Sequence, residues 1–246
     1  MSGHNKWSSI KHKKGAQDAK RSKMFSRMVK EIQVAVKEGG PDPEANPRLR
    51  MAIQNAKGVN MPKDNIQRAV NKSSDADALE SHTFEGYAPN GIGVVIECLT
   101  DNHQRAVSSI RAVFNKKGGN LATNGSLSFM FDTKGVFTIP KEGIDRDTFE
   151  LEVIDAGVED IEEDDEFFTL YTPKEEFGSL QKKLDEMNIT PENSGLKKIP
   201  TNTKELDKES ALKVLKIVED IEELEDVQNV YHNLEITDDV MAAYNA

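Results

Sequence analysis

The chain has 246 residues, 37 % of them hydrophobic and 30 % charged, so it is long enough for two or three domains and too apolar to be wholly disordered. Its one cysteine, Cys98, excludes an intrachain disulfide and a cysteine-based zinc finger. The formal net charge is −11, yet residues 1–75 hold 16 basic and 7 acidic side chains, against 16 and 36 in the remainder. The first part should therefore attract polyanions, of which nucleic acid is the most common.

No run of about 18 apolar residues is present, so we expect no membrane-spanning helix and no membrane partner. The basic N-terminus is not followed by an apolar stretch, which argues against a secretory signal. A mitochondrial transit peptide is also basic and Ser-rich, but lysine dominates here and the segment runs directly into a predicted helix. We therefore expect a cytoplasmic protein.

The first 16 residues contain Gly3, Gly15 and paired serines without periodicity, which predicts a flexible arm. A helix is predicted for 17–38, because its apolar residues recur every three or four positions and share one face. These residues are Phe25, Met28, Val29, Ile32 and Val36. Four cations fall within an arc of about 80° on the opposite face: Lys20, Lys23, Arg27 and Lys30. One face is thus suited to a core and the other to an anion.

Two shorter helices complete an N-terminal module. The GGP sequence at 39–41 ends the first helix. Asn46 and Pro47 predict the N-cap and first turn of a second helix, which ends near Gly58. Pro62 opens a third helix. Three short amphipathic helices indicate a small helical module.

After a polar, acidic stretch at 73–81, predicted to be a linker, the pattern changes to short apolar runs typical of strands. The predicted strands are 92–100, 127–132, 136–139, 158–163, 166–172, 195–199 and 227–234. The predicted helices are 102–117, 146–157, 174–187 and 208–224. From 134 to 205 the order is βαββαβ, which is that of a ferredoxin-like sandwich.

The segment 84–132 has the order ββαβ and lacks a second helix, while the last predicted helix and strand have no partners of their own. Pairing these two incomplete parts buries the apolar faces of both. We therefore predict an α+β fold, with an N-terminal three-helix module followed by two α/β sandwich domains, the middle one discontinuous. The predicted domains are a basic arm plus helical domain at 1–75, a discontinuous middle domain at 83–133 and 206–240, and an inserted domain at 134–205.

The candidate site is the basic arm together with the basic face of the first helix. Clustered cations supply phosphate contacts, and Trp7 supplies a ring for stacking or, equally, an anchor for the arm. The predicted nucleic-acid-binding residues are Lys6, Trp7, Lys11, His12, Lys13, Lys14, Lys20, Arg21, Lys23, Arg27 and Lys30. Phosphate contacts position a protein without reading sequence, so this site does not separate DNA from RNA.

Other polar segments favour simpler interpretations. The loop 115–126 (NKKGGNLATNGS) does not fit a nucleotide-binding motif, so we interpret it as an RNA-contacting or mobile loop. The acidic run 159–166 favours a solvated turn over a metal site, because a hairpin spreads its carboxylates over both faces. Cys98 is predicted to be buried and inert. His4 and His12 lack a third metal ligand nearby. Without a catalytic motif, we expect no enzymatic activity, no metal, no cofactor and no small-molecule substrate.

Several long motifs occur in order along the chain, and through them it closely resembles the YebC/PmpR family, which includes the mitochondrial translational activator of cytochrome c oxidase. Phe84 and Asn90 stand where the family more often has other residues. The motifs are GHNKWSSIKHKKGAQDAKRSKMFSR, GGPDPEANPRLRMAIQNAKGVNMPKDNIQRAV, FEGYAPNGIGVVIE, TDNHQRAVSSIRAVFNKKGGNLA, FMFDTKG and DVQNVYHNLEI.

The resemblance implies a cytosolic protein of three domains that regulates gene expression, with the basic N-terminal motif touching nucleic acid. Some members are described as DNA-binding transcriptional regulators. Others are described as ribosome-associated factors that help translation through stretches such as consecutive prolines. We therefore expect a non-enzymatic, DNA-binding transcriptional regulator, with a factor bound to ribosomal RNA as the alternative. A protein adaptor, whose acidic part docks a basic partner, is a further hypothesis, and a metal-dependent hydrolase is another.

Overall fold

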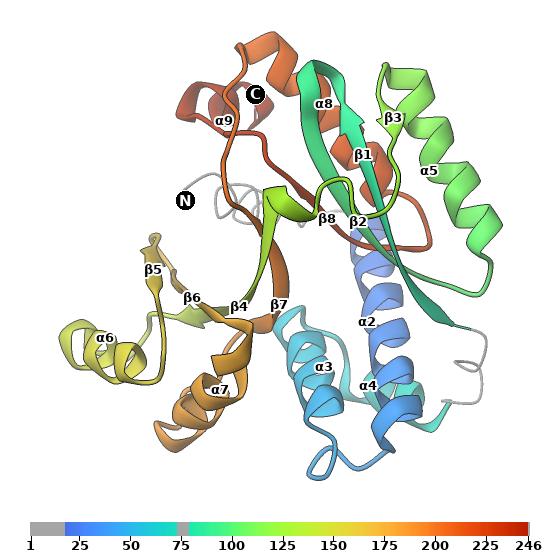
Figure 1. The fold of residues 1–246 in the computed structure, drawn as a ribbon. Coiled ribbons are helices and arrows are strands. Elements are labelled where there is room, and N and C mark those ends of the chain that lie inside the picture. The colour runs from blue at the N-terminus through green and yellow to red at the C-terminus, as the bar shows by residue number, and fades with distance from the viewer. Residues whose placement is uncertain (1–17, 73–78, 246) are drawn as a thin grey trace. The chain divides into compact units, whose positions relative to one another are not determined.

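The computed structural model describes residues 18–72 and 79–245 (Figure 1). The N-terminal module consists of three helices, as predicted: α2 Asp18–Gly39, α3 Pro47–Gly58 and α4 Lys63–Asn71. Their apolar faces form one core around Ile32, Leu49 and Ala56, which are fully buried. The predicted arm at 1–16 and most of the predicted linker lie outside the described residues.

Helix α3 begins where the sequence predicts, because the Asn46 side chain hydrogen-bonds to an amide that follows it in the chain and to two carbonyls that precede it. Its Oδ1 accepts a hydrogen bond from the Leu49 amide at 3.0 Å, while Nδ2 donates to the carbonyls of Ala35 at 2.7 Å and Gly40 at 2.8 Å. Asn46 is only 4 % exposed. One buried carboxamide therefore caps α3 and ties it to the end of α2.

The first sheet has the order β3-β1-β2-β8, and its pairings are antiparallel. Its strands are β1 Glu80–Ala88, β2 Ile92–Thr100, β3 Asn120–Leu121 and β8 Val227–His232. The helices that share its core are α5 His103–Lys117, α8 Lys208–Glu222 and α9 Asp238–Asn245. Because β8 hydrogen-bonds to β2 across more than a hundred residues of sequence, the middle domain is discontinuous.

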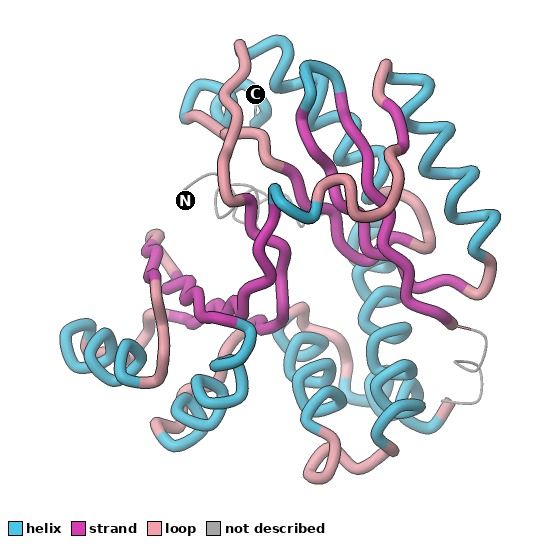
Figure 2. The backbone as a smooth tube through the Cα atoms, viewed as in Figure 1, coloured by secondary structure: helices cyan, strands magenta, loops and turns pink. Residues whose placement is uncertain are grey.

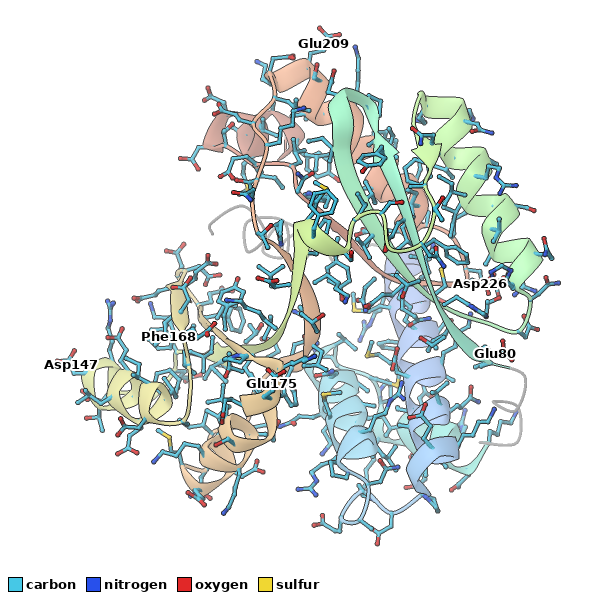
Figure 3. All side chains as sticks on the ribbon, in the orientation of Figure 1. Glu80, Asp147, Phe168, Glu175, Glu209 and Asp226 are labelled. Atoms are coloured by element: carbon cyan, nitrogen blue, oxygen red, sulfur yellow. The ribbon has the colours of Figure 1, made fainter. Side chains whose placement is uncertain are left out.

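The second sheet has the order β5-β6-β4-β7 (Figure 2). Its strands are β4 Phe131–Pro140, β5 Asp160–Glu163, β6 Phe167–Pro173 and β7 Asn193–Pro200. Two helices, α6 Arg146–Asp155 and α7 Phe177–Glu186, connect them. Phe137, Phe149 and Phe168 are buried in the core that these elements share. Phe168 is labelled in Figure 3. This strand order and the βαββαβ connectivity are those of a ferredoxin-like domain, as predicted.

The predicted fold class is confirmed: three helices precede two α/β domains with four-stranded antiparallel sheets. Among the described residues, 79–132 and 198–245 form one compact unit, and 18–72 and 133–197 form another. Within the second unit, the Asn55 carboxamide donates to the Ser194 carbonyl at 2.8 Å and accepts from the Ser194 amide at 2.9 Å. The three domain boundaries proposed from the sequence remain a prediction.

The predicted strand at 127–132 is wrong. Ser128–Met130 forms a short 3₁₀ turn, η3, and the strand begins only at Phe131, from where it continues unbroken through the predicted strand at 136–139. The apolar residues of this segment resembled a strand pattern, but Leu127 and Met130 instead pack on the face of the first sheet. The strand that completes this sheet is β3, which lies inside the predicted loop 115–126.

Two other elements differ from the sequence prediction. Strand β1 already begins at Glu80, inside the segment predicted to be a linker, because its residues pair along β2 up to Thr100. Helix α9 was not predicted from the sequence; it is short and carries two aspartates in its first turn. Its Val240 is nevertheless buried in the core with α8, so tertiary packing stabilises this helix.

Candidate nucleic-acid interface

The predicted site residues divide into two groups by position. Six of them lie outside the described residues: Lys6, Trp7, Lys11, His12, Lys13 and Lys14. Lys20 belongs to α2 by its backbone, although its side chain is also outside the described part. The structure places the side chains of the other four on α2: Arg21, Lys23, Arg27 and Lys30.

The predicted apolar face of α2 packs on the core of the module, with Ile32 and Val36 buried and the other three residues partly buried. Its basic face is less open than the sequence suggests. Arg21 is exposed, and its guanidinium carbon lies 5.5 Å from the centre of the Phe25 ring, a cation–π contact. Lys23, Arg27 and Lys30 are half-buried, and each already interacts with other residues. The second half of α2 also buries Gln33 and Val34, so this helix is covered on more than its predicted apolar side.

Four further cations are exposed that were not among the predicted site residues. Lys57 lies in the last turn of α3, Lys63 and Arg68 lie on α4, and Lys72 follows it. None of them forms an ion pair with a described residue. The period of α4, whose Ile66 and Ala69 are buried, is the signal that places Lys63 and Arg68 on its solvent side.

Other cations of the helical module are engaged in its structure. Arg48 pairs with Glu38 and, at 3.8 Å, with Glu31. Arg50 donates to the carbonyls of Pro43 and Glu44, both at 3.2 Å. Even so, residues 18–72 contain twelve basic and six acidic side chains, a net charge of +6. This module is therefore the cationic part of the described chain.

The acidic region of the inserted domain is held together by its own cations. Lys141 donates a hydrogen bond to Glu163, and Arg146 lies 2.9 Å from the same carboxylate. These contacts, the hydrogen bond first, lower the pKa of Glu163 below its usual value. Burial raises the pKa of Tyr171 well above its usual value, and its hydroxyl donates to Glu162 at 3.1 Å. In the described part of the chain, no cluster of three or more potential metal ligands is present.

Cys98 is 1 % exposed, which confirms the prediction of a buried thiol.

None of the helices in the described ranges is long and apolar enough to cross a bilayer.

The fold and this charge distribution define a class: a three-part α+β protein with a cationic helical module ahead of two α/β domains, one of them discontinuous and the other ferredoxin-like. Comparison with known proteins identifies the family. Residues 5–76 match the TACO1/YebC protein N-terminal domain, and residues 79–234 match the TACO1/YebC second and third domain. The chain therefore belongs to the YebC/TACO1 family, as the sequence motifs predict.

Relatives are similar over nearly their whole length. A probable transcriptional regulatory protein from Amoebophilus asiaticus is 49 % identical over 239 residues, which cover 95 % of this chain and 98 % of that protein. One from Rubrobacter xylanophilus is 45 % identical and covers 98 % of both chains. The crystal structure of a conserved hypothetical protein, Aq1575 from Aquifex aeolicus, superposes with a TM-score of 0.80 at 39 % identity, covering 89 % of this chain and 91 % of that one.

Proposed function

We propose that this chain is a non-enzymatic regulator of gene expression that binds nucleic acid through its basic N-terminal region. The observation that carries the proposal is the excess of cations in residues 18–72, several of them exposed and without an ion pair to a described residue. The predicted arm residues add to the same charge. Cations of this kind bind phosphates and release counterions, which supplies affinity without sequence specificity.

The names of the relatives favour transcription, so double-stranded DNA is the first target to test. Ribosomal RNA, bound by a translation factor that relieves stalling, is the alternative target. Crosslinking in cells, followed by sequencing of the bound DNA and RNA, separates them when it is combined with sedimentation of ribosomes. A promoter footprint supports transcription, whereas ribosomal RNA footprints with co-sedimentation support the alternative.

The direct test is charge reversal to glutamate at five predicted contacts: Lys11, Lys13, Lys14, Lys20 and Lys23. A protein making six to ten phosphate contacts loses roughly 10³- to 10⁵-fold in affinity between about 50 and 200 mM salt. We expect the variant to lose binding of duplex DNA and of an RNA fragment while its circular dichroism spectrum is unchanged. The matched control reverses Lys174, Lys182 and Lys208, which lie outside the module and should leave binding intact. Unchanged binding in the first variant contradicts the proposal.

One observation favours a second function, docking of a basic protein. Leu151 and Ile154 are 68 % and 54 % exposed, one turn apart on α6. The stretch 142–166 around them contains thirteen acidic side chains and one basic side chain. An exposed apolar pair surrounded by acidic side chains is suited to bind a basic amphipathic helix of a partner protein. Partner binding that persists after deletion of residues 1–30, but fails after L151S and I154S, supports this function.

A further inference from the structure

The short turn η3 presents an aromatic ring to solvent. Phe129 is 75 % exposed, more than any other large apolar side chain in the described ranges, while Leu127 and Phe131 on either side are buried. The turn is the helical segment at the start of β4 in Figure 2. Because the neighbours of Phe129 are anchored, its exposure follows from the backbone conformation of the turn.

The turn lies directly on the face of the first sheet that is opposite its helices. Leu127 and Met130 pack with Val95 and Tyr231. A Cβ atom at Gly93 would lie 3.1 Å from Met130 Cε and 3.4 Å from Leu127 Cδ1. The absence of a side chain at this position therefore lets the turn approach the strand closely.

Hydrogen bonds fix the backbone that leads into the turn. The Glu85 carboxylate accepts from the amides of Gly125 at 3.0 Å and Leu127 at 2.7 Å, and Glu85 is only 8 % exposed. On the other side, the Thr201 amide donates to the Met130 carbonyl at 2.9 Å. Gly125 has a φ of +89°, which glycine adopts without strain.

Burial of a carboxylate is unfavourable unless hydrogen bonds compensate it, and the bonds of Glu85 are made to the segment that leads into this turn. An exposed phenyl ring contributes little to the stability of the fold, because most of its apolar surface stays in water. The turn thus presents to solvent a ring that the protein core does not use.

We propose that Phe129 is a stacking platform for an unpaired base of the bound nucleic acid. The inference rests on the proposed function and adds that, beside duplex DNA, the chain binds nucleic acid that contains unpaired nucleotides, such as an RNA loop or a single strand of DNA. Every base has a π-face, so one ordered ring suffices for such a contact. A protein interface would instead need a cluster of apolar anchors, and Phe129 is the only exposed large apolar side chain of the described turn.

Exposed residues that precede the turn in sequence are polar and uncharged. Thr123 and Asn124 are exposed on the segment before the turn. The contact should contribute stacking rather than phosphate attraction.

The experiment measures the affinity of the full chain for an RNA hairpin with an unpaired loop and for a duplex of equal length and charge. Phe129→Ala should weaken hairpin binding by about 5- to 150-fold, since stacking on one base is worth this much, and should leave duplex binding unchanged. Phe129→Trp should restore hairpin binding. The dependence of log affinity on log salt should keep its slope, because the substitution removes no cation that binds phosphate. Leu196→Ala, another exposed apolar position, is the matched control.

The outcomes separate this inference from the proposed function. Equal hairpin affinity for the wild type and Phe129→Ala overturns the stacking role, and so does an equal reduction for hairpin and duplex. Loss of binding to a protein partner with unchanged hairpin affinity also overturns it, and identifies Phe129 as a protein contact. If the wild-type chain binds neither probe, the proposed function itself fails.

Discussion

The guanidinium of Arg105 donates two hydrogen bonds to the carboxylate of Asp226, from Nε at 3.0 Å and from Nη2 at 2.8 Å. These residues are 121 positions apart and belong to the two separate segments of the middle domain. The Asp226 side chain is 8 % exposed, so its charge depends on this partner. The pKa of Arg105 is raised above its usual value, first by the hydrogen bond to Asp226 and then by that to Asp101.

We expect Arg105→Met to destabilise the protein more than Asp101→Asn. The first variant leaves the buried Asp226 carboxylate without its bidentate donor, whereas Asp101 is 52 % exposed and stays solvated. Urea titrations followed by circular dichroism measure both midpoints. Equal midpoints for the two variants would show that the Arg105–Asp226 pair does not stabilise the association of the two segments.

Asn46→Ala should lower the free energy of unfolding by about 2–4 kcal/mol, because it removes a helix cap and leaves one buried and one part-buried carbonyl without this donor. Asn102 is the matched control, since it caps α5 through a single side-chain hydrogen bond to the Arg105 amide. Its replacement by Ala should cost about 1 kcal/mol. Similar destabilisation at both positions, measured by urea denaturation, would contradict the bridging role of Asn46.

Gly125→Ala should reduce hairpin binding although the Phe129 ring is kept. A non-glycine residue at this positive φ costs about 1–2 kcal/mol and shifts the backbone that leads into the turn. Gly195 offers a control, because a Cβ there meets no atom within 4 Å and its φ is not in the left-handed region. If the two variants bind the hairpin alike, positioning of the ring by the turn is not required.

The four exposed cations near α4 should each contribute to phosphate binding. Replacing Lys57, Lys63, Arg68 and Lys72 by Gln should lower the salt dependence of duplex DNA binding, with the log–log slope falling by up to about 0.9 for each cation that binds a phosphate. Fluorescence anisotropy at several salt concentrations gives this slope. The triple replacement of Lys174, Lys182 and Lys208 by Gln should leave it unchanged. An unaltered slope in the first variant would restrict the interface to α2 and the arm.

The Asp207 cap should make stability depend on pH. Hydrogen bonds from Ser210, side chain first and then amide, lower the pKa of Asp207 below its usual value of 3.8. Its contribution is therefore complete above about pH 5 and disappears as the pH falls through the lowered pKa. Asp207→Asn keeps an acceptor but cannot titrate. We expect the stability difference between wild type and variant to change between about pH 5 and pH 2 in thermal unfolding. A constant difference would contradict this linkage.

Short-range pattern was sufficient for most helices and strands. The three-and-four spacing from Phe25 to Val36 predicts α2, and Asn46 with Pro47 predicts the start of α3, because both signals depend on neighbouring residues. The β-branched run 92–100 predicts β2 for the same reason. Charge asymmetry and the family motifs are likewise properties of the sequence alone, and they indicated the basic N-terminal region as the candidate site.

Only the tertiary structure decided what depends on residues distant in sequence. The segment that leads into the turn at Ser128–Met130 is bonded to Glu85, about 40 positions earlier, and the turn packs beside Gly93, so its local pattern gave the wrong element. The half-burial of Lys23, Arg27 and Lys30 and the exposure of Phe129 also follow from packing. Periodicity states which side chains share a face, but long-range contacts determine which faces are covered.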